Sequence, residues 1–317
     1  MLTQPLPQTS GKKTGITIGN FDGVHLGHQL LVRETLEICR QRSLDSIAIT
    51  FWPHPRALFS GHEMPALADP QTRSRLLAGL GIQKVLDIKF TRELAALSPD
   101  EFVRKFLLPL NVDSLVIGYD FCLGKGRCGD FDALKKLGER YGFSVTQVPP
   151  LLFGDLPISS TRLRQAINEG QLALALSMLG RPYSVRGTVV HGFGRGTGLG
   201  FPTANLQPPQ TLLPPDGVYA GIVLHKDAFY PAVTNIGFAP TFGGTERTIE
   251  SFILEGSPTL YDEEIELLFL RRLRDEKKFP SVQELTAQIA QDVARARELG
   301  SAYMEHARAA HAARTSS

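Results

Sequence analysis

Hydrophobic residues in the first half of the chain gather in short β-rich runs, and helical patterns alternate with these runs. The runs predict strands at 15–19, 46–51, 84–90, 112–118 and 143–148. The helical patterns lie at 27–42, 71–80, 99–108 and 131–141, and the first carries an apolar stripe that includes Leu30, Leu31, Leu36 and Ile38. Strands separated by helices predict βαβ units in a mostly parallel sheet. Such a sheet binds ligands at the carboxyl ends of its strands, here the loops 20–26, 52–56 and 119–130.

The pattern changes near residue 182. A helical stretch at 161–178 runs into Gly180-Arg181-Pro182, and glycine followed by proline is a helix stop signal. We therefore predict two domains, 1–182 and 183–317. The second domain has strand-like runs without intervening helices at 184–191, 217–225, 230–237, 248–255 and 263–270. Such runs predict a small antiparallel barrel or sandwich.

A last helix is predicted at the end of the second domain. It begins near Ser281, which forms a capping box with Glu284 three residues later. The alanine-rich tail after residue 302 is expected to fray, and no internal repeat interrupts the pattern.

Composition narrows the class of protein. A length of 317 residues with 42% hydrophobic residues allows two cores. The formal net charge of +2 argues against a large nucleic-acid footprint, which needs clustered cations. Cys39, Cys122 and Cys128 form no C-x-x-C pair, as is typical of reduced thiols in a cytosolic protein. No signal peptide or membrane span is visible, so we expect a soluble cytoplasmic protein.

The first candidate site follows the first predicted strand, in the run GNFDGVHLGH at 19–28. His25 and His28 are three residues apart and share a face of a helical first turn, where free amides attract anions. Imidazoles there can donate to phosphate oxygens as charge builds up in displacement at phosphorus. Two alternatives remain: histidines that only cap or pack, and a zinc site with His54 as third ligand.

A second phosphate element is the run ISSTRLR at 158–164. The hydroxyls of Ser160 and Thr161 lie where a helix starts, and Arg164 can present a fork of donors to a phosphate. The alternative is an ordinary helix cap with surface arginines.

The motifs GNFDGVHLGH, TFWPHP (50–55), IGYDFCLGKGRCGD (117–130) and ISSTRLR together resemble the bacterial bifunctional riboflavin kinase/FMN adenylyltransferase family. The resemblance implies an α/β Rossmann-like nucleotidyltransferase domain that converts ATP and FMN to FAD and pyrophosphate. It assigns the ATP phosphates to His25, His28, Ser160, Thr161 and Arg164. It also implies that the same cleft is lined by Asn20 on the ATP side and by Asp120 and Arg127 on the flavin side.

The second candidate site is a glycine-rich run, HGFGRGTGLGFPTAN at 191–205. Alternating glycine makes a poor strand, so we expect a loop that wraps a ligand, and it is neither a P-loop nor a protein-kinase loop. Simple flexibility is the alternative. In the following turn Thr203 and Asn205 supply neutral oxygens suited to Mg²⁺, and Mn²⁺ also fits such ligands. Glu250 is a carboxylate within an apolar strand, either a general base or a solvent-facing or paired residue.

The runs LGFPTAN, NIGFAPTFGG, RTIES and LRDEKKF resemble the kinase half of the same family, a six-stranded flavin-binding barrel. The resemblance places Gly192 and Gly194 on ATP, and Thr203 and Asn205 on Mg²⁺-ATP. It gives Glu250 the activation of the ribityl 5′-hydroxyl and puts Arg274 on the flavin side.

The combined expectation is an enzyme that phosphorylates riboflavin and adenylylates FMN, with riboflavin, FMN and ATP as its small-molecule partners. Nucleic-acid and membrane partners are not expected, and the oligomeric state is open. Two alternatives are a monofunctional FMN adenylyltransferase with an impaired kinase, because 196–198 departs from the family pattern, and a non-catalytic flavin sensor. An aminoacyl-tRNA synthetase-like ligase is disfavoured because SSTRLR stands where a KMSKS-type lysine loop would be needed.

Overall fold

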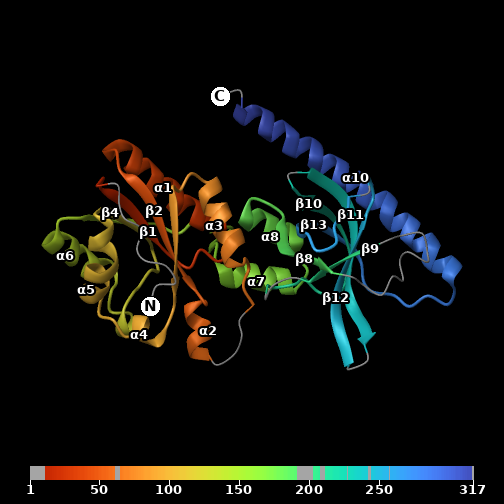
Figure 1. Cartoon of the computed structure of the whole chain (residues 1–317), viewed down its shortest axis with the longest axis horizontal. Coiled ribbons are helices and arrows are strands. Elements are labelled where there is room, and N and C mark those ends of the chain that lie inside the picture. The colour runs from red at the N-terminus through yellow and green to blue at the C-terminus, as the bar shows by residue number, and fades with distance from the viewer. Residues whose placement is uncertain are drawn as a thin grey trace. The chain divides into compact units, whose positions relative to one another are not determined.

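The chain clusters into two compact units, residues 1–162 and 163–317, in a computed structural model (Figure 1). The structure describes residues 11–60, 65–190, 203–207, 211–226, 228–241, 244–256 and 258–315. The domain boundary near residue 182 stays a prediction.

The first unit is built on a parallel sheet, as predicted. Its strands are β1 (Thr14–Ile18), β2 (Asp45–Trp52), β3 (Lys84–Lys89), β4 (Val112–Gly118) and β5 (Ser144–Val148). They lie in the order β3-β2-β1-β4-β5, and every pair is parallel. The order reverses between β1 and β4, and the carboxyl ends of strands at such a reversal are where ligands bind in open α/β sheets. The loop after β1 therefore holds the most favourable position for a site.

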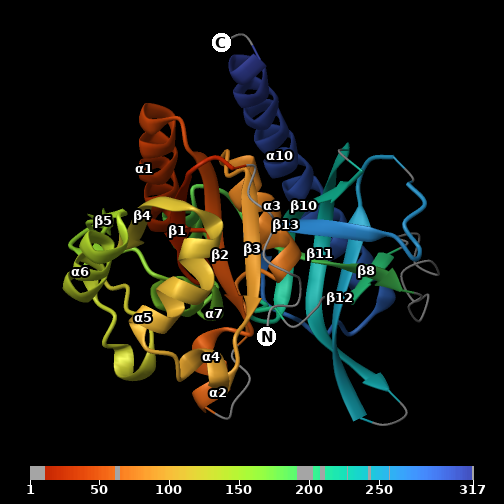
Figure 2. The ribbon, with the colours of Figure 1, turned by 60° about the vertical axis from the view of Figure 1, so that its left-hand side comes forward.

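Helices cover both faces of this sheet (Figure 2). The helices α1 (Leu26–Arg42) and α3 (Pro70–Gly79) bury Leu31, Val32 and Leu77 against one face. The helices α5 (Pro99–Phe102) and α6 (Phe131–Tyr141) bury Phe102 and Leu134 against the other. Short helices α2 (Pro55–Ser60), α4 (Arg92–Ala95) and η3 (Lys125–Arg127) complete the connections.

Two predicted helical stretches are subdivided in the structure. The stretch at 99–108 is helical throughout but changes type, from α5 to the π-helix η1 (Val103–Leu107) and the 3₁₀ helix η2 (Leu108–Leu110), because Pro109 lacks the amide that a regular α-helix needs. The stretch at 161–178 is two helices, α7 (Ser160–Asn168) and α8 (Leu172–Leu179). Gly170 interrupts it at a φ of 70°, a left-handed conformation that ends a helix. A small hairpin, β6 (Leu152–Phe153) with β7 (Leu156–Pro157), precedes α7.

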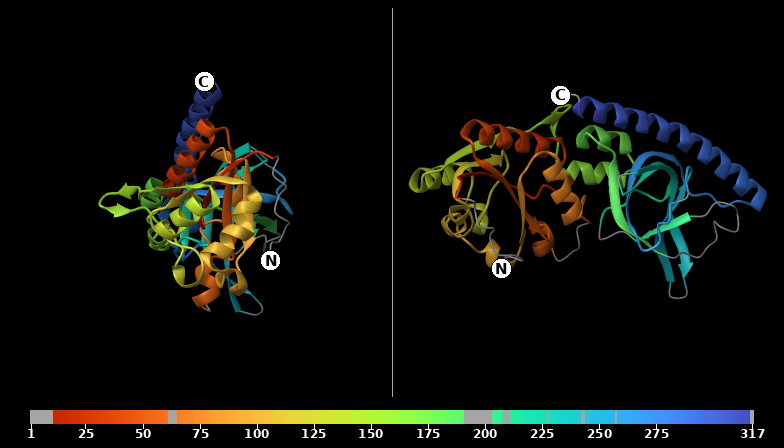
Figure 3. Two further views of the ribbon diagram at one scale, coloured as in Figure 1. Left: turned by 90° about the vertical axis from the view of Figure 1, so that its left-hand side faces the viewer. Right: turned by 45° about the horizontal axis from the view of Figure 1, so that its top comes forward.

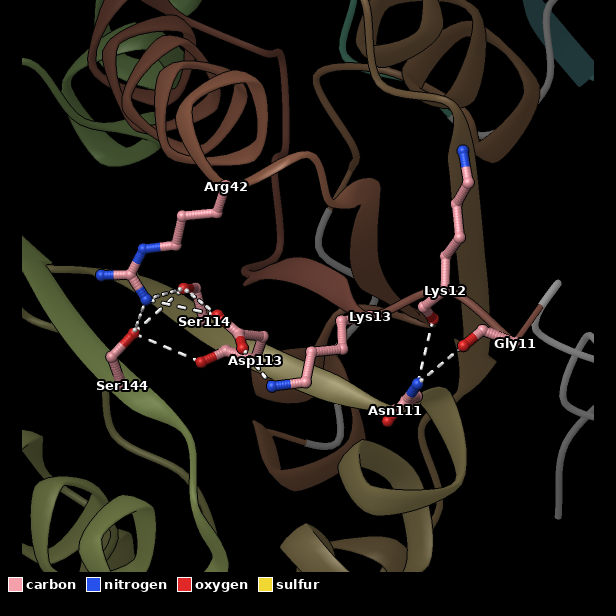
Figure 4. Close-up of polar contacts among 8 residues, drawn as sticks. All are labelled: Gly11, Lys12, Lys13, Arg42, Asn111, Asp113, Ser114 and Ser144. Atoms are coloured by element: carbon pink, nitrogen blue, oxygen red, sulfur yellow. Dashed lines mark hydrogen bonds and ion pairs between the residues drawn. The ribbon is translucent and has the colours of Figure 1, made fainter.

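A polar cluster ties together the amino ends of the strands (Figure 4). Arg42, the last residue of α1, donates to Asp113 Oδ1 at 3.2 Å and to the hydroxyls of Ser114 and Ser144 at 3.0 Å each. Lys13 donates to Asp113 Oδ2 at 2.8 Å and, with Arg42, lowers the pKa of that carboxyl. The cluster fixes the end of α1 to β4 and β5, at the amino ends of the strands and opposite the predicted ligand loops.

The second unit is a closed antiparallel barrel, one of the two predicted forms (Figure 1). Its strands are β8 (Tyr183–Val190), β9 (Thr203–Gln207), β10 (Gly217–His225), β11 (Ala228–Thr241), β12 (Gly244–Ile253) and β13 (Glu264–Arg274). They follow the order β10-β11-β12-β9-β8-β13. The segment with Thr203 and Asn205 was predicted as a turn and is the strand β9, which pairs with β12 and β8.

The helix α10 (Val282–Thr315) runs along the outside of the barrel (Figure 3). Its Ala296 packs with Val218, Ala220 and Val233 of the strands. Ser281 Oγ accepts from the Glu284 amide at 3.3 Å, which confirms the N-cap half of the predicted capping box. The helix continues through the alanine-rich tail to Thr315, as the high helix propensity of alanine favours, and the expected fraying after residue 302 stays a prediction. Within the described part of the chain, no helix has the length and apolarity needed to cross a membrane.

Candidate active sites

The turn after β1 has an unusual backbone. Phe21, Gly23 and Val24 have φ values of 48°, 80° and 42°. Positive φ suits glycine but costs about 1–3 kcal/mol at a residue such as Val24. Asp22 holds the turn, because its Oδ1 accepts from the amides of Leu67 and Ala68 at 2.9 and 3.3 Å. Strain held in place by such bonds is typical of a functional turn.

The two histidines of this turn form a stacked pair. Their ring centroids are 3.6 Å apart with 15° between the planes. His25 is the N-cap of α1, and its Nδ1 accepts from the His28 amide at 3.3 Å. Since Nδ1 accepts, the proton of neutral His25 lies on Nε2, which can donate to a ligand. A Cβ atom at Gly27 would lie 3.2 Å from the His25 ring, so glycine leaves room for this orientation.

His28 is uncharged at neutral pH. Burial lowers its pKa well below the usual value, and the nearby His25 and Arg73 lower it further. Its Nδ1 is buried and, among the residues that the structure describes, has no hydrogen-bond partner. A buried polar atom without a partner is costly unless a ligand or water satisfies it. This atom therefore fits a site that is completed by a bound polar group.

The second predicted phosphate element lies against the same turn. Ser160, the first residue of α7, donates from Oγ to the Asp22 carbonyl at 3.0 Å. The Ile158 carbonyl is 3.6 Å from where a Cβ of Gly27 would be. The start of α7 thus meets the turn that leads into α1, and helix amino termini favour anions. Thr161 is exposed beside Ser160, and Arg164 follows Ser160 by one helical turn.

Arg73 is a site residue that the sequence analysis missed. It is 2% exposed, and its Nη1 donates to the carbonyls of Asn20 and Phe51 at 3.3 and 3.2 Å. Its Nη2 forms an ion pair with Asp87, and Thr50 Oγ1 also donates to the Asn20 carbonyl, at 3.1 Å. Arg73 therefore joins the carboxyl ends of β1, β2 and β3. Its position four residues before the buried Leu77 is the signal that could have placed it inward.

The other predicted residues of this domain lie in neighbouring loops. Asp120 and Arg127 are exposed in the loop after β4, where Arg127 Nη2 donates to the Asp120 carbonyl at 3.4 Å. His54 follows β2, and its Nδ1 accepts from the Arg56 amide at 3.2 Å. In the portion of the chain that is described, no cluster of three or more histidines, cysteines or acids could hold a metal ion.

The predicted kinase residues lie side by side on the barrel. Glu250 of β12 is paired directly with Asn205 of β9 and, on its other side, with Asn235 of β11. Directly paired residues of antiparallel strands project from the same face. Thr203 projects from that face as well, because it lies two residues from Asn205 on β9. Gly192 and Gly194 lie outside the described residues.

Arg274 ends β13 and is bonded to the outer helix. Its Nε donates to Asp292 of α10 at 2.9 Å, and its Nη1 donates to the Asp275 carbonyl at 3.0 Å. Its guanidinium lies 5.6 Å from the centre of the Phe279 ring. In the barrel, Arg274 is paired with Val218, which is itself paired with Asn235. Arg274, the residue predicted on the flavin side, thus lies two strands from Asn235 in the same row of paired residues.

Known protein families match both units. The model of the FAD synthetase family matches residues 8–162, and the model of the riboflavin kinase family matches residues 179–300. A parallel-sheet domain of the first kind followed by a barrel of the second defines a two-domain flavin-nucleotide enzyme.

Individual proteins agree with these models. A bifunctional riboflavin kinase/FMN adenylyltransferase of Escherichia coli K12 is 41% identical over 286 residues, covering 89% of this chain and 91% of the relative. A Pseudomonas fluorescens protein of the same name is 37% identical over 285 residues, covering 89% and 92%. A crystal structure described as a macrolide-efflux protein from Streptococcus pneumoniae matches with a TM-score of 0.83 at 31% identity, covering 94% of this chain and 99% of that one. The chain belongs to the bifunctional riboflavin kinase/FMN adenylyltransferase family.

Proposed function

We propose that this enzyme makes FMN and FAD in two ATP-dependent steps at two separate sites. The site around His25 and His28 adenylylates FMN, and the site around Glu250 phosphorylates riboflavin. The observation that carries the proposal is that residues of each predicted set contact one another. Ser160 bonds to the turn that holds the histidines, and Asn205 pairs with Glu250 in the barrel.

In the adenylylation step, a phosphate oxygen of FMN attacks the α-phosphorus of ATP. A new P–O bond forms, the bond to the β-phosphate breaks, and pyrophosphate leaves with the electron pair. His25 and His28 donate hydrogen bonds to the phosphate oxygens as negative charge builds up, and burial keeps His28 neutral. The helix start with Ser160 and Thr161, together with the Arg164 fork, holds the same triphosphate. Asn20 lies toward ATP, and Asp120 and Arg127 lie toward the flavin.

In the kinase step, Glu250 takes the proton of the ribityl 5′-hydroxyl while that oxygen attacks the γ-phosphorus of ATP. The bond to the β-phosphate oxygen breaks and ADP leaves. Thr203 and Asn205, two neutral oxygen ligands on the face of Glu250, suit Mg²⁺ or Mn²⁺. When bound there, the ion would neutralise charge on the ATP phosphates. Gly192 and Gly194 approach ATP, and Arg274 lies on the flavin side.

We further propose that the enzyme acts in the cytoplasm on riboflavin, FMN and ATP, without nucleic-acid partners. Cys39, Cys122 and Cys128 are free thiols, as expected for a reducing compartment.

The test uses two single substitutions, and each domain serves as the folding control of the other. His28→Ala should abolish FAD formation from FMN while the rate of riboflavin phosphorylation stays within about twofold. Glu250→Gln should do the reverse. Each reaction is run with ATP and Mg²⁺ and followed by chromatography of riboflavin, FMN and FAD. Loss of both reactions in either folded variant would refute separate sites, and a wild-type chain that leaves riboflavin unchanged would support the sensor alternative.

A further inference from the structure

A second amide flanks Glu250 on the side opposite Asn205. Asn235 of β11 is paired directly with Glu250 of β12, in the same way as Asn205 of β9. Directly opposite residues have Cβ atoms about 5 Å apart, and their side chains interact. Asn235 is half-buried and opens the run NIGFAPTFGG, but it received no role of its own above. The carboxylate of Glu250 therefore stands between two amides on one face of the barrel.

A hydrogen bond to Glu276 orients the amide of Asn235. Its Nδ2 donates to Glu276 Oε1 at 3.4 Å, and Glu276 lies in the segment that follows β13. A carboxylate only accepts hydrogen bonds, so the amide nitrogen must face Glu276. The amide oxygen is then directed away from Glu276 as an acceptor, and an alcohol is the kind of group that can donate to it.

The backbone of β11 is adapted to this contact. Gly237 lies two residues after Asn235 and therefore on the same face. A Cβ atom at Gly237 would overlap with the Glu276 carboxylate, so only glycine lets this side chain lie across the strand. Glu276 follows Arg274 by two residues, and Arg274 is anchored to Asp292 of α10. The contact thus joins β11 to the segment that directly follows the anchored end of β13.

We infer that Asn235, oriented by Glu276, binds the 4′-hydroxyl of the ribityl chain, the secondary alcohol next to the 5′-hydroxyl that is phosphorylated. This inference rests on the proposed role of Glu250 as general base. With the neighbouring hydroxyl held by Asn235 Oδ1, the reacting hydroxyl is kept at the carboxylate of Glu250 and does not rotate freely. Such positioning lowers the entropy that must be lost in the transition state. Asn235 is a substrate-binding residue, and Glu276 is a positioning residue.

Three substitutions test this contact from different sides. Asn235→Ala removes the acceptor, Glu276→Gln removes the charge that orients the amide, and Gly237→Ala displaces Glu276 without changing either polar group. We expect kcat/KM for riboflavin to fall about tenfold or more in Asn235→Ala, the loss of one well-placed hydrogen bond, and by less in the other two. The KM for ATP should stay within about twofold, and FMN adenylylation by the same chain reports correct folding. Glu264→Gln, at the far end of β13, is the matched control and should leave both rates unchanged.

A substrate analogue separates binding from a merely structural effect. The wild-type enzyme should phosphorylate riboflavin that lacks the 4′-hydroxyl about tenfold less efficiently. Asn235→Ala should show no further loss with this analogue, because the missing partners belong to one hydrogen bond. Equal loss on both substrates, or full activity of all three variants, would overturn the inference. If instead Glu250→Gln keeps the kinase rate, the proposed function itself fails. If Glu250→Gln loses that rate but the three substitutions at Asn235, Glu276 and Gly237 do not change it, only this inference fails.

Discussion

Arg73→Met removes the cation that joins three strand ends beneath the adenylylation site. Methionine keeps the aliphatic stem in the core but leaves Asp87 without its guanidinium partner. It also removes the donor to the Phe51 carbonyl, whereas the Asn20 carbonyl keeps the bond from Thr50. The perturbation is therefore chiefly a carboxylate that loses its ion-pair partner but keeps the bond from Ser74 Oγ at 3.0 Å, and one carbonyl that loses a donor.

The expected loss follows from these partners. Removing one member of a buried ion pair destabilises a protein by about 3–5 kcal/mol. The Arg73 side chain is 3% exposed but that of Asp87 is 31% exposed, so water can partly rehydrate the Asp87 carboxylate in the variant. We therefore expect the free energy of unfolding of the first unit to decrease by about 3 kcal/mol, the lower end of the range. Arg75→Met, on the exposed side of the same helix, should cost less than about 0.5 kcal/mol.

The chain contains its own fluorescent probe for this measurement. Trp52 is its single tryptophan, and the Arg73 guanidinium lies 6.0 Å from the centre of that ring. Urea unfolding followed by tryptophan fluorescence therefore reports the unit that contains Arg73, even if the barrel unfolds in a separate transition. A loss below about 1 kcal/mol, or one equal to that of Arg75→Met, would refute the assignment of Arg73 as the buried tie between the strands.

Two further predictions concern titration. The pKa of folded His28 is lowered, so protonation of this imidazole should reduce FMN adenylylation only below the ordinary histidine range, as a pH–rate profile would show. The unfolded chain protonates His28 near pH 6.5, so the free energy of unfolding should fall as the pH drops below about 6.5. In urea titrations, His28→Gln should lessen that fall. If the variant shows the same dependence of unfolding free energy on pH, His28 is not a buried neutral imidazole. Burial raises the pKa of the Cys39 thiol to about 11, whereas Cys128 is exposed. At pH 8 a thiol reagent should therefore modify Cys128 in the folded protein and Cys39 only in urea. Mass spectrometry of the labelled protein measures both. Native labelling of Cys39 at the rate of Cys128 would contradict this burial.

The parts of the fold that depend on local sequence could be predicted. The strand, turn and helix around His25 and His28 are contiguous, and their glycines and helix start are visible in ten residues. Ser160 was also predicted, because a hydroxyl cluster at a helix start carries its own local signal. The parallel sheet followed from the alternation of strands and helices, which is a repeated local pattern.

Features that depend on distant partners were missed. The strand β9 is five residues long with little apolar content, and only its pairing with β12 and β8 makes it a strand. Arg73 is one of two arginines in α3, and its partners lie at the ends of β1, β2 and β3. Gly170 could have been read as a helix break, since it is a glycine between two helical runs. The contact between Asn235 and Glu276 spans two strands and a loop, and no spacing in the sequence indicates it.

Mixing two inactive variants is the sharpest test of whether FMN and FAD synthesis use two independent sites. His28→Ala alone should convert riboflavin only to FMN, and Glu250→Gln alone should leave riboflavin unchanged. An equimolar mixture of the two folded variants with riboflavin, ATP and Mg²⁺ should make FAD, because FMN released by one is adenylylated by the other. With ATP labelled at the γ-phosphorus or at the α-phosphorus, FMN should carry only the γ label and FAD should carry either. A mixture that makes no FAD, although each variant retains its own remaining activity, would contradict the account.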